Sequence, residues 1–460
     1  MTSAADVPSD LRRRLAEHGQ EHLLASWSEL NEQDRLDFAG QLQTIDLTAV
    51  AQRCALEFEM PQGSIEPCPS LTPTEEDHGR GEEAIGRGLL GVLTVAGGQG
   101  TRLGWSGPKG TFPAAPVTGK SLFQLIAEQV LFAQRRYGIV IPWYIMTSLE
   151  NDAVTRSFLL DNNCFGLDRT DIFVFPQGCL PAVDAANGRV LLAGAGEVAM
   201  SPDGHGGVVE ALRQSGGLEQ MHARGVEHLS YVQIDNPLVH AVDPAFLGLH
   251  LGAESSGEAS SKMVPKTDPA ERVGVLCRRD GRTMVVEYSD LPSATAEERN
   301  GDGSLRFDAA SIAVHLFSTA FLRSAGGDLP WHRAVKEVPY FDFDSGRVVH
   351  PKEANAVKFE RFVFDLLPRA ERSIVMATPR EEEFAPIKNA SGNDSPQTSK
   401  QMQVDRAARW LESRGVEVPR NDDGRPVAMI EISPLTAAFA DQIPTADLPP
   451  AISPDLPTAI

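Results

Sequence analysis

At residues 88–110 the chain reads GLLGVLTVAGGQGTRLGWSGPKG, an apolar run that leads directly into a loop rich in glycine. The run at 88–95 contains β-branched residues, which favours a buried strand. Further on, Ser121 is followed three residues later by Gln124, a pattern that predicts a capping box at the start of a helix. The buried face of this helix is marked by Leu122, Leu125, Ile126, Val130 and Ala133. Strand, glycine loop and helix in this order predict one unit of an open α/β sheet.

The same alternation continues along the chain. Apolar, strand-like segments lie at 140–147, 171–175 and 229–234, with a helical pattern at 155–162 between the first two. Because strands that alternate with helices form parallel sheets covered on both faces, the predicted fold is α/β with a central, mostly parallel Rossmann-like sheet. Shorter strand-like segments follow at 273–277, 284–288 and 311–317.

The two ends of the chain have a different character. Residues 9–53 have helical periodicity, with apolar positions that include Leu11, Leu15, Leu23, Leu24, Trp27 and Leu30. Residues 61–85 are rich in Pro, Gly and acidic residues and are interpreted as a linker. One helix is predicted at 401–414, and a loosely ordered tail after it. The predicted division is an amino-terminal helical arm and linker (1–85), a catalytic domain (86–395) and a carboxyl-terminal helix and tail (396–460).

Composition excludes several classes of protein. The chain has 460 residues and a formal net charge of −21, which disfavours binding to nucleic acid or to anionic membranes because both reward clustered Lys and Arg. The five cysteines are scattered without CxxC spacing, so neither a zinc site nor a disulfide framework is indicated. No apolar run has the length of a membrane helix or a signal peptide. We therefore expect a cytoplasmic protein.

The glycine loop has the properties of a phosphate-binding loop. Gly97, Gly98 and Gly100 allow main-chain N–H groups to approach a phosphate or a flat base. Arg102 and Lys109 add two cations, which a polyphosphate needs as counter-charges. Such a loop at the carboxyl end of a parallel strand is where open α/β sheets bind ligands. An ordinary tight turn accounts for two glycines but not for four, the fourth being Gly104, in a loop that also carries two cations.

Two similar patterns are excluded by spacing. The dinucleotide fingerprint GxGxxG requires glycine at position 103, where the chain has Leu103. The P-loop pattern would end at Lys120 and Ser121, but its first glycine would fall on Ala114. An NAD-dependent oxidoreductase is therefore disfavoured.

The loop AGGQGTRLG, followed by PKG, resembles the signature of the eukaryotic-type UDP-sugar pyrophosphorylases, and most closely the branch that acts on N-acetylglucosamine 1-phosphate. Further blocks occur in that family's order, so the resemblance extends from about residue 11 to about residue 400. They are WYIMTS (143–148), CFGL (164–167), PQGCLPA (176–182), MSPDGHGG (200–207), QIDNPLV (233–239), KTDPAERVGVLC (266–277), VVEYS (285–289), VKFERFVFD (357–365) and EEFAPIKNASG (383–392). The resemblance implies a nucleotidyltransferase sheet of the GT-A-like kind.

The resemblance also implies roles for individual residues. Arg102 and Lys109 would hold the phosphates that leave as pyrophosphate, and Lys388 would contact the sugar phosphate and the α-phosphate. Gln177 would complete recognition of uracil through its amide, for which the alternative is a loop-stabilising role. The remaining nucleotide-binding positions would be Val95, Ala96, Gly97, Gly98, Gly100, Thr101, Gly204 and His205.

Asp235, directly after the strand at 229–234, would face both the metal, Mg²⁺ with Mn²⁺ as the alternative, and the sugar. Its alternative role is to cap the following turn. The other sugar-binding positions would be Gly274, Glu287, Tyr288, Ser311, Phe362 and Phe364. For the two phenylalanines, a purely structural role in the core is the alternative.

The implied reaction is direct in-line attack of a sugar 1-phosphate on the α-phosphorus of UTP, with no protein nucleophile. Two positions depart from the N-acetylglucosamine branch: His205 stands where that branch has Asn, and Ser311 where it has another Asn. N-acetylglucosamine 1-phosphate is therefore the favoured substrate, and glucose or galactose 1-phosphate, or a broad range of sugars, is the alternative. A non-catalytic nucleotide-sugar-binding protein is a remote alternative. We expect a monomer or a weak homo-oligomer.

Overall fold

The computed structural model of the chain describes residues 7–56, 63–325, 327, 329–446 and 448–460. The chain forms two compact units, each assembled from three separate stretches. The smaller unit consists of Met1–Gln62, Gln177–Gly207 and Leu329–Val363, and the larger unit of Gly63–Pro176, Val208–Asp328 and Phe364–Ile460. The domain boundaries predicted at residues 85 and 395 stay a prediction. Residues 1–6 of the predicted arm, 57–60, and 61–62 of the predicted linker lie outside the described residues.

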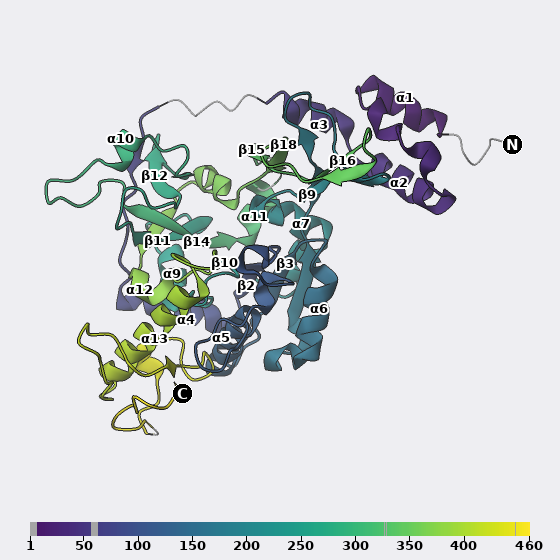
Figure 1. The fold of residues 1–460 in the computed structure, drawn as a ribbon. Helices are drawn as coiled ribbons and strands as arrows, with labels where there is room; N and C mark the ends of the chain where they lie inside the picture. Colours follow the sequence, from purple (N-terminus) through teal and green to yellow (C-terminus); the bar gives the residue numbers. More distant parts are fainter. Residues whose placement is uncertain (1–6, 57–62, 326, 328, 447) are drawn as a thin grey trace. The chain divides into compact units, whose positions relative to one another are not determined.

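The larger unit is built on a ten-stranded mixed sheet (Figure 1). Four neighbouring strands are parallel: β10 (His228–Gln233), β2 (Leu90–Val95), β3 (Trp143–Thr147) and β4 (Ile172–Pro176). Every side chain of β3 is buried, as expected for a strand covered on both faces. These are the four strands that the sequence predicts.

The other half of the sheet is largely antiparallel. The long strand β14 (Ala309–Ser318) pairs antiparallel with β10, β11 (Ala259–Pro265) and β12 (Val275–Arg279), and β12 forms a hairpin with β13 (Arg282–Val286). The three shorter segments predicted downstream correspond to β12, β13 and β14. The α/β fold class, with parallel strands flanked by helices, is confirmed, and the sheet as a whole is mixed. The sheet is completed by β19 (Ile374–Ala377), parallel to β11, and β1 (Glu66–Pro67), antiparallel to β12.

Helices α5 (Leu122–Tyr137) and α6 (Asp152–Asp161) lie beside the parallel strands (Figure 1). Ser121 caps α5 by accepting a hydrogen bond from the Gln124 N–H at 3.2 Å. The predicted capping box is only half correct, because the Gln124 side chain donates to Glu128 instead of returning to the cap. Besides α4 and α13, which are described below, the larger unit contains the helices α7 (Val208–Gln214), α8 (Gly217–Ala223), α9 (Pro244–His250), α10 (Ser293–Ala296), α11 (Thr319–Ala325) and α12 (Arg380–Glu383).

The interpretation of residues 61–85 as a linker is wrong for its second half, which forms helix α4 (Glu75–Gly86). Thr74 and Asp77 form a capping box, so the acidic residues that suggested a linker are the first turn of the helix. The glycines let α4 approach α9: a Cβ on Gly81 would lie 1.8 Å from the Pro244 carbonyl oxygen. The content of glycine and acidic residues indicated a loop, because composition alone does not reveal that glycines on a helix allow a second helix to cross it closely.

The predicted loosely ordered tail is also wrong. Helix α13 (Pro396–Ser413), predicted at 401–414, packs with later residues in a small hydrophobic cluster that includes Leu411, Ile430 and Ile452. Two short strands, β20 (Ile430–Glu431) and β21 (Thr458–Ala459), pair in parallel. The Glu431 carboxylate accepts hydrogen bonds from the N–H groups of residues 117 and 118, so this segment holds the loop that precedes α5. The apolar residues of this segment are too sparse to show a helical or strand period, so the sequence did not reveal that they are buried against α13.

The smaller unit contains the predicted helical arm, with α1 (Ser9–Glu17), α2 (Glu32–Thr44) and α3 (Leu47–Cys54). Among the predicted apolar positions, Leu11, Leu15, Leu23 and Trp27 are buried in one cluster, and Leu24 and Leu30 pack partly buried against it. The strands of this unit are β15 (His332–Lys336), β18 (Ala356–Glu360) and β6 (Val183–Asp184) in one sheet, and the pairs β5 (Cys179–Pro181) with β9 (Met200–Pro202), β7 (Leu192–Gly194) with β8 (Glu197–Val198), and β16 (Tyr340–Asp342) with β17 (Arg347–Val349). Across all described residues, the helices lack the length and apolar character needed to cross a bilayer.

The crossing of α4 and α9 gives a matched pair of glycine substitutions. Gly81→Ala should lower the free energy of unfolding by about 1–3 kcal/mol, because its Cβ would collide with the Pro244 carbonyl and force the helices apart. Gly79→Ala, on the exposed side of the same helix with no atom within 4 Å of its Cβ, should be neutral or stabilising by up to about 1 kcal/mol. Thermal and urea unfolding of both variants checks this. Equal effects at the two positions would contradict the close crossing.

Candidate functional site

The glycine loop after β2 folds back on itself. The N–H of Gly100 donates to the Gly107 carbonyl at 3.0 Å, and the N–H of Lys109 donates to the Gly98 carbonyl at 3.0 Å. A Cβ at position 100 would lie 2.6 Å from the Trp105 Cβ, so glycine is required there for the loop to close over the indole. The loop is therefore a closed ribbon whose two ends, at the carboxyl end of β2 and at Lys109, lie side by side.

A buried asparagine that sequence reasoning missed fixes the start of this loop. Asn151, in the turn before α6, donates from Nδ2 to the Ala96 carbonyl at 3.2 Å, and its Oδ1 accepts from the Ser148 N–H at 2.9 Å. The side chain is 1% exposed. Because a buried amide that is satisfied by backbone groups fixes their position, the loop conformation is set from β3 as well as from β2. Its only sequence signal is its place just after a predicted strand.

Lys109 forms an ion pair with Asp235 across 126 positions of sequence. Lys109 belongs to the short 3₁₀ helix η4 (Lys109–Thr111), and Asp235 follows the end of β10. The Lys109 Nζ lies 3.1 Å from Asp235 Oδ2. Burial alone would raise the pKa of Asp235, but the ammonium groups of Lys109 and Lys388 lower it below its ordinary value. The carboxylate is therefore ionised at neutral pH.

The segment that carries Lys388 is attached to the same end of β10. The N–H of Ile387 donates to the backbone carbonyl of Asp235 at 2.8 Å. The Lys388 ammonium lies 5.8 Å from the centre of the Phe384 ring, and the backbone N–H of Lys388 donates to the Asp394 carbonyl. Lys109 and Lys388, which are far apart in sequence, therefore both act on Asp235.

Arg102 differs from the two lysines. It lies in the 3₁₀ helix η3 (Thr101–Leu103), where Thr101 and Arg102 are both exposed. Within the described part of the chain it makes no ion pair. Its predicted contact with the leaving phosphates stays a prediction.

Three of the predicted sugar-binding residues lie together in the antiparallel half of the sheet. The N–H of Ser311 donates to the Gly274 carbonyl at 2.8 Å, and a Cβ on Gly274 would lie 3.2 Å from Glu287 Oε1. Tyr288 is 49% exposed, next to Glu287. Beyond Ser311, Ala313 has φ +54°, an uncommon value for alanine, where β14 passes the irregularity in β11.

Gln177, Gly204, His205 and Phe362 belong to the smaller unit, and all other predicted site residues, Phe364 included, belong to the larger one. Within the smaller unit, the His205 ring stacks on the Phe362 ring with 5.3 Å between centroids, and His205 Nδ1 accepts from the Val363 N–H at 3.2 Å. Burial, with a smaller contribution from His332, lowers the pKa of His205 to about 4. Its imidazole is therefore neutral at pH 7, with the proton on Nε2.

Close backbone contacts explain the glycines of this loop. Gly204 has φ +84°, and a Cβ there would lie 2.5 Å from the Arg361 carbonyl oxygen. The preceding Asp203 accepts a charge-assisted hydrogen bond from Arg361 at 2.5 Å. Gln177, at the start of this part of the unit, is 7% exposed.

The described residues contain no group of three or more His, Cys, Asp or Glu side chains that could hold a metal by themselves. Mg²⁺ typically uses one or two carboxylates together with waters and substrate oxygens. A single ionised carboxylate between two ammonium groups therefore fits a divalent cation that arrives with a polyphosphate, and does not fit a resident structural metal.

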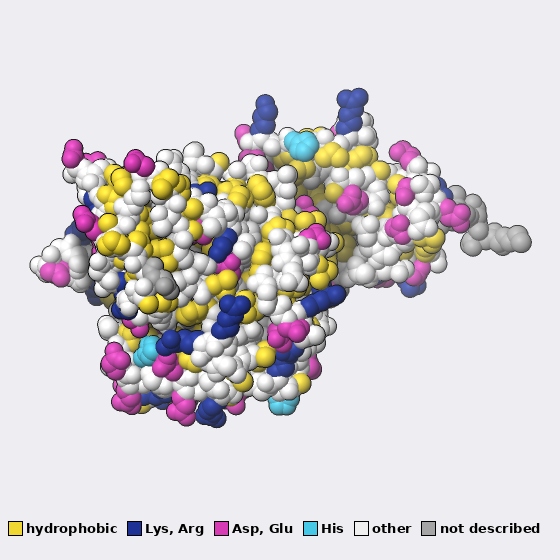
Figure 2. Space-filling view, turned by 90° about the horizontal axis from the view of Figure 1, so that it is seen from below, with side chains coloured by type: hydrophobic (Ala, Val, Ile, Leu, Met, Phe, Trp, Pro, Cys, Tyr) yellow, Lys and Arg dark blue, Asp and Glu magenta, His cyan; other side chains and the backbone are white. Residues whose placement is uncertain are grey.

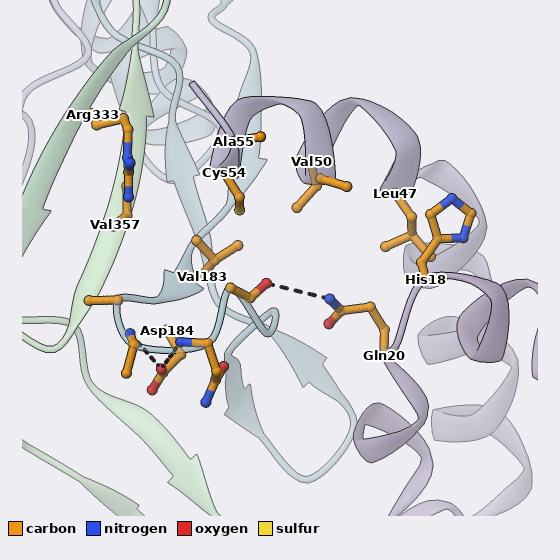
Figure 3. A pocket seen from close by; sticks show the side chains of 15 residues that line it. His18, Gln20, Leu47, Val50, Cys54, Ala55, Val183, Asp184, Arg333 and Val357 are labelled. Carbon is orange, nitrogen blue, oxygen red and sulfur yellow. Dashed lines mark hydrogen bonds between the residues drawn. The ribbon is translucent and has the colours of Figure 1, made fainter. Parts of the chain in front are cut away.

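Two features of the protein surface were compared with the predicted site, the distribution of charge and a cavity in the smaller unit. On the face shown in Figure 2, Lys and Arg side chains are interspersed with Asp and Glu and form no single basic patch among the drawn, described residues. In the smaller unit, a cavity of about 460 Å³ lies between the helical arm and the turn after β6; its lining includes His18, Val50, Cys54, Asp184 and Arg333 (Figure 3). None of the predicted site residues lines it.

Comparison with known proteins gives consistent matches. The family described as UTP–glucose-1-phosphate uridylyltransferase matches residues 59–414. The UDP-N-acetylhexosamine pyrophosphorylase-like protein 1 of Xenopus tropicalis is 35% identical over 96% of this chain and 94% of its own length. The UDP-N-acetylglucosamine pyrophosphorylase of Saccharomyces cerevisiae is 32% identical over 89% of this chain and 92% of its own. The crystal structure of the Trypanosoma brucei uridine diphosphate N-acetylglucosamine pyrophosphorylase superimposes with a TM-score of 0.80, at 26% identity, over 97% and 98% of the two chains.

Two aspartates should affect stability with opposite dependence on pH. The folded-state pKa of Asp235 is lowered, so its ion pair with Lys109 stabilises the fold above its ordinary pKa of 3.8, and this is lost as pH falls through the folded value. Asp235→Asn should therefore cost about 1–3 kcal/mol at neutral pH. Burial raises the pKa of Asp308, so Asp308→Asn should stabilise the fold at neutral pH.

Both effects should shrink toward acid pH. Urea unfolding at several pH values between about 7 and 2 checks the signs, because the Asp235 contribution is lost only below its ordinary pKa of 3.8. A destabilised Asp308→Asn variant, or an Asp235→Asn variant as stable as the wild type at neutral pH, would contradict the electrostatics described here.

Proposed function

The chain belongs to the UTP–glucose-1-phosphate uridylyltransferase family, and from this premise we propose that it converts UTP and N-acetylglucosamine 1-phosphate to UDP-N-acetylglucosamine and pyrophosphate. The observation that carries the proposal is the convergence of Lys109 and Lys388 on Asp235 at the carboxyl end of β10. This edge of an open α/β sheet is where ligands bind. The names of the relatives support the choice of N-acetylglucosamine, because several are N-acetylglucosamine or N-acetylhexosamine pyrophosphorylases.

In the proposed reaction a phosphate oxygen of the sugar 1-phosphate attacks the α-phosphorus of UTP in line. A new P–O bond forms to the α-phosphorus, the bond from it to the bridging oxygen breaks, and pyrophosphate leaves with that oxygen. Two anions must meet, so charge neutralisation and positioning dominate such transfers and no protein nucleophile is needed. Lys388 would hold the two reacting phosphates together, and Lys109 and Arg102 would hold the leaving pyrophosphate.

A divalent cation, Mg²⁺ or Mn²⁺, bound at Asp235 would supply further neutralisation of phosphate charge. The protein's part is to present an ionised carboxylate for it, and the lowered pKa of Asp235 supports that role. The ion pair with Lys109 orients this carboxylate.

The glycine loop would bind the nucleotide. Main-chain groups of Val95, Ala96, Gly97 and Gly98 are proposed to hold uracil and ribose, with Gly100 and Thr101 following the phosphates. Gln177 would complete uracil recognition, and Gly204 and His205 would border the nucleotide. The hydrogen bond from Asn151 to the Ala96 carbonyl holds the loop in one conformation, which reduces the conformational entropy that the loop loses when it binds the nucleotide.

Glu287 is proposed to accept hydrogen bonds from sugar hydroxyls, and Gly274 to leave space for close approach. Tyr288, Ser311, Phe362 and Phe364 would complete the sugar site. Ser311 is also the observation that favours a second candidate, glucose or galactose 1-phosphate, because serine lacks the amide that an N-acetyl group can use. The reactants are therefore UTP and a hexose 1-phosphate. We further propose a monomer or weak homo-oligomer in the cytoplasm; five free cysteines suit a reducing compartment.

Purified protein should release pyrophosphate from UTP and N-acetylglucosamine 1-phosphate in the presence of Mg²⁺. Lys388→Met should lower kcat about 100- to 1,000-fold, because it removes charge from the reacting phosphates. Lys352→Met, an exposed lysine of the smaller unit, is the matched control and should leave the rate unchanged. A coupled pyrophosphate assay over a panel of sugar 1-phosphates makes the measurement. Wild-type protein that leaves UTP intact with every sugar offered would refute the proposal.

Ser311→Asn tests the sugar site separately. Restoring an amide should raise kcat/KM for N-acetylglucosamine 1-phosphate relative to glucose 1-phosphate by about tenfold, the worth of one additional hydrogen bond. The ratio is measured by competition in a single reaction with both sugar phosphates. An unchanged ratio would remove Ser311 from the determinants of specificity.

A further inference from the structure

A fully buried lysine contacts Glu383, the first residue of the segment 383–388 that carries Lys388. Lys262, on β11, is 0% exposed, and its ammonium lies 2.6 Å from Asp243 Oδ2 and 2.6 Å from Glu383 Oε1. Burial by itself lowers the pKa of Lys262, but the two carboxylates raise it above its ordinary value, so the ammonium stays charged. The Glu383 carboxylate also accepts from Thr378 Oγ1 at 3.1 Å and from the His240 N–H at 3.3 Å. Glu383 is thereby fixed through its side chain.

Asn236 fixes the same segment through its backbone. Its Nδ2 donates to the Glu383 carbonyl at 2.7 Å, and its Oδ1 accepts from the Ala385 N–H at 3.0 Å. The side chain is 4% exposed. Two positions further on, the Ile387 N–H donates to the carbonyl of Asp235. Three backbone groups of residues 383–387 are therefore bound by the dipeptide Asp235–Asn236.

Lys388 follows directly after this attached segment. The dipeptide that presents the carboxylate is thus also the dipeptide that holds the backbone leading to Lys388, over a separation of 147 positions between Asn236 and Glu383. We propose that Asn236, with the Lys262–Glu383 ion pair behind it, is a positioning residue that fixes Lys388 relative to Asp235 and so sets the turnover rate. This inference rests on the proposed function.

The energetics favour positioning over stability as the role of this cluster. Removing a charge from water costs several kcal/mol, and buried ion pairs are often no more stabilising than apolar residues of similar size. An amide bound at both ends by backbone groups holds them in one geometry. Because a misplacement of about 1 Å can cost about 100-fold in rate, the placement of Lys388 is a property that such an arrangement can control.

A double-mutant cycle tests the proposal in the full-length protein. Asn236→Ala should lower kcat about 10- to 100-fold and change the KM for UTP less than about threefold, because the chemical step needs Lys388 in place. In a Lys388→Met background, Asn236→Ala should lower kcat by less than about twofold, because its effect passes through the lysine already removed. Asn236→Ala that lowers kcat equally in both backgrounds would overturn the proposal.

Asn355 provides the matched control, because its amide also uses both its donor and its acceptor on backbone groups, here the N–H and carbonyl of Val338 in the smaller unit. Any effect of Asn355→Ala should be the same with and without Lys388→Met. If Asn236→Ala fails to fold, Glu383→Gln is used in the same cycle. It keeps an oxygen for Lys262 and leaves Asp243 paired, and its effect on kcat should likewise vanish with Lys388→Met.

Hydrogen exchange gives a readout that does not depend on activity. Peptides that cover residues 384–389 should lose protection at least tenfold in Asn236→Ala and keep it in Asn355→Ala, because the Ala385 amide loses its acceptor. Unchanged protection would overturn the positioning role. If the wild type released no pyrophosphate, the proposed function would fail, and exchange would still decide whether Asn236 holds this segment.

Discussion

The candidate site depends on one electrostatic arrangement, a carboxylate held between two ammonium groups at the end of a buried strand. Asp235 is kept ionised by Lys109 and Lys388, and each of the three residues arrives on a different part of the chain. The central strand β10 brings them together, because its carboxyl end is next to that of β2, from which the glycine loop begins. Opposite charges in this partly buried position attract more strongly than they would in water. The glycine loop, the 383–388 segment and the sheet all meet at this point.

The protein obtains this arrangement by attaching loops to strand ends with buried amides. Asn151 holds the glycine loop at the end of β3, and Asn236 holds the Lys388 segment at the end of β10. Each amide uses both its donor and its acceptor on the backbone, so neither polar end of these two side chains is left unsatisfied. The charged cluster around Lys262 adds a second attachment for the same segment. Rigid strands thus determine the geometry of loops that have little regular structure of their own.

Local patterns in the sequence predicted the parallel half of the sheet well. An apolar run, a glycine loop and an amphipathic helix are features of neighbouring residues, so β2 and α5 could be recognised directly. The roles of Lys109, Asp235 and Lys388 came from a family resemblance, and the structure brings these three together. Helix α4 and the ordered carboxyl-terminal segment were missed because their stability depends on distant partners: α9 for the first, and α13 for the second.

The attachments themselves could not be predicted. Asn236 and Glu383 are bonded across 147 positions, and Lys262 and Glu383 across 121, with no local signal at either end. An asparagine or lysine in isolation is ordinarily a surface residue, and only the fold shows that these are buried. The prediction of Gln177 and the sugar-side residues as ligand contacts rests on resemblance, and that of Arg102 rests also on the pattern of the glycine loop. All of these contacts stay predictions.

The contact of Glu431 with residues 117 and 118 has a consequence for biosynthesis. Thr118, in the loop between Lys109 and α5, is tied to a residue that is synthesised 313 positions later. Chains generally fold from the amino terminus as they are made. The strands of the large sheet, the last of which is β19, can therefore pair before residue 431 is made, whereas the loop before α5 gains this contact only once Glu431 has been synthesised. Nascent chains would thus pass through a stage with a formed sheet and a loop before α5 that still lacks this attachment.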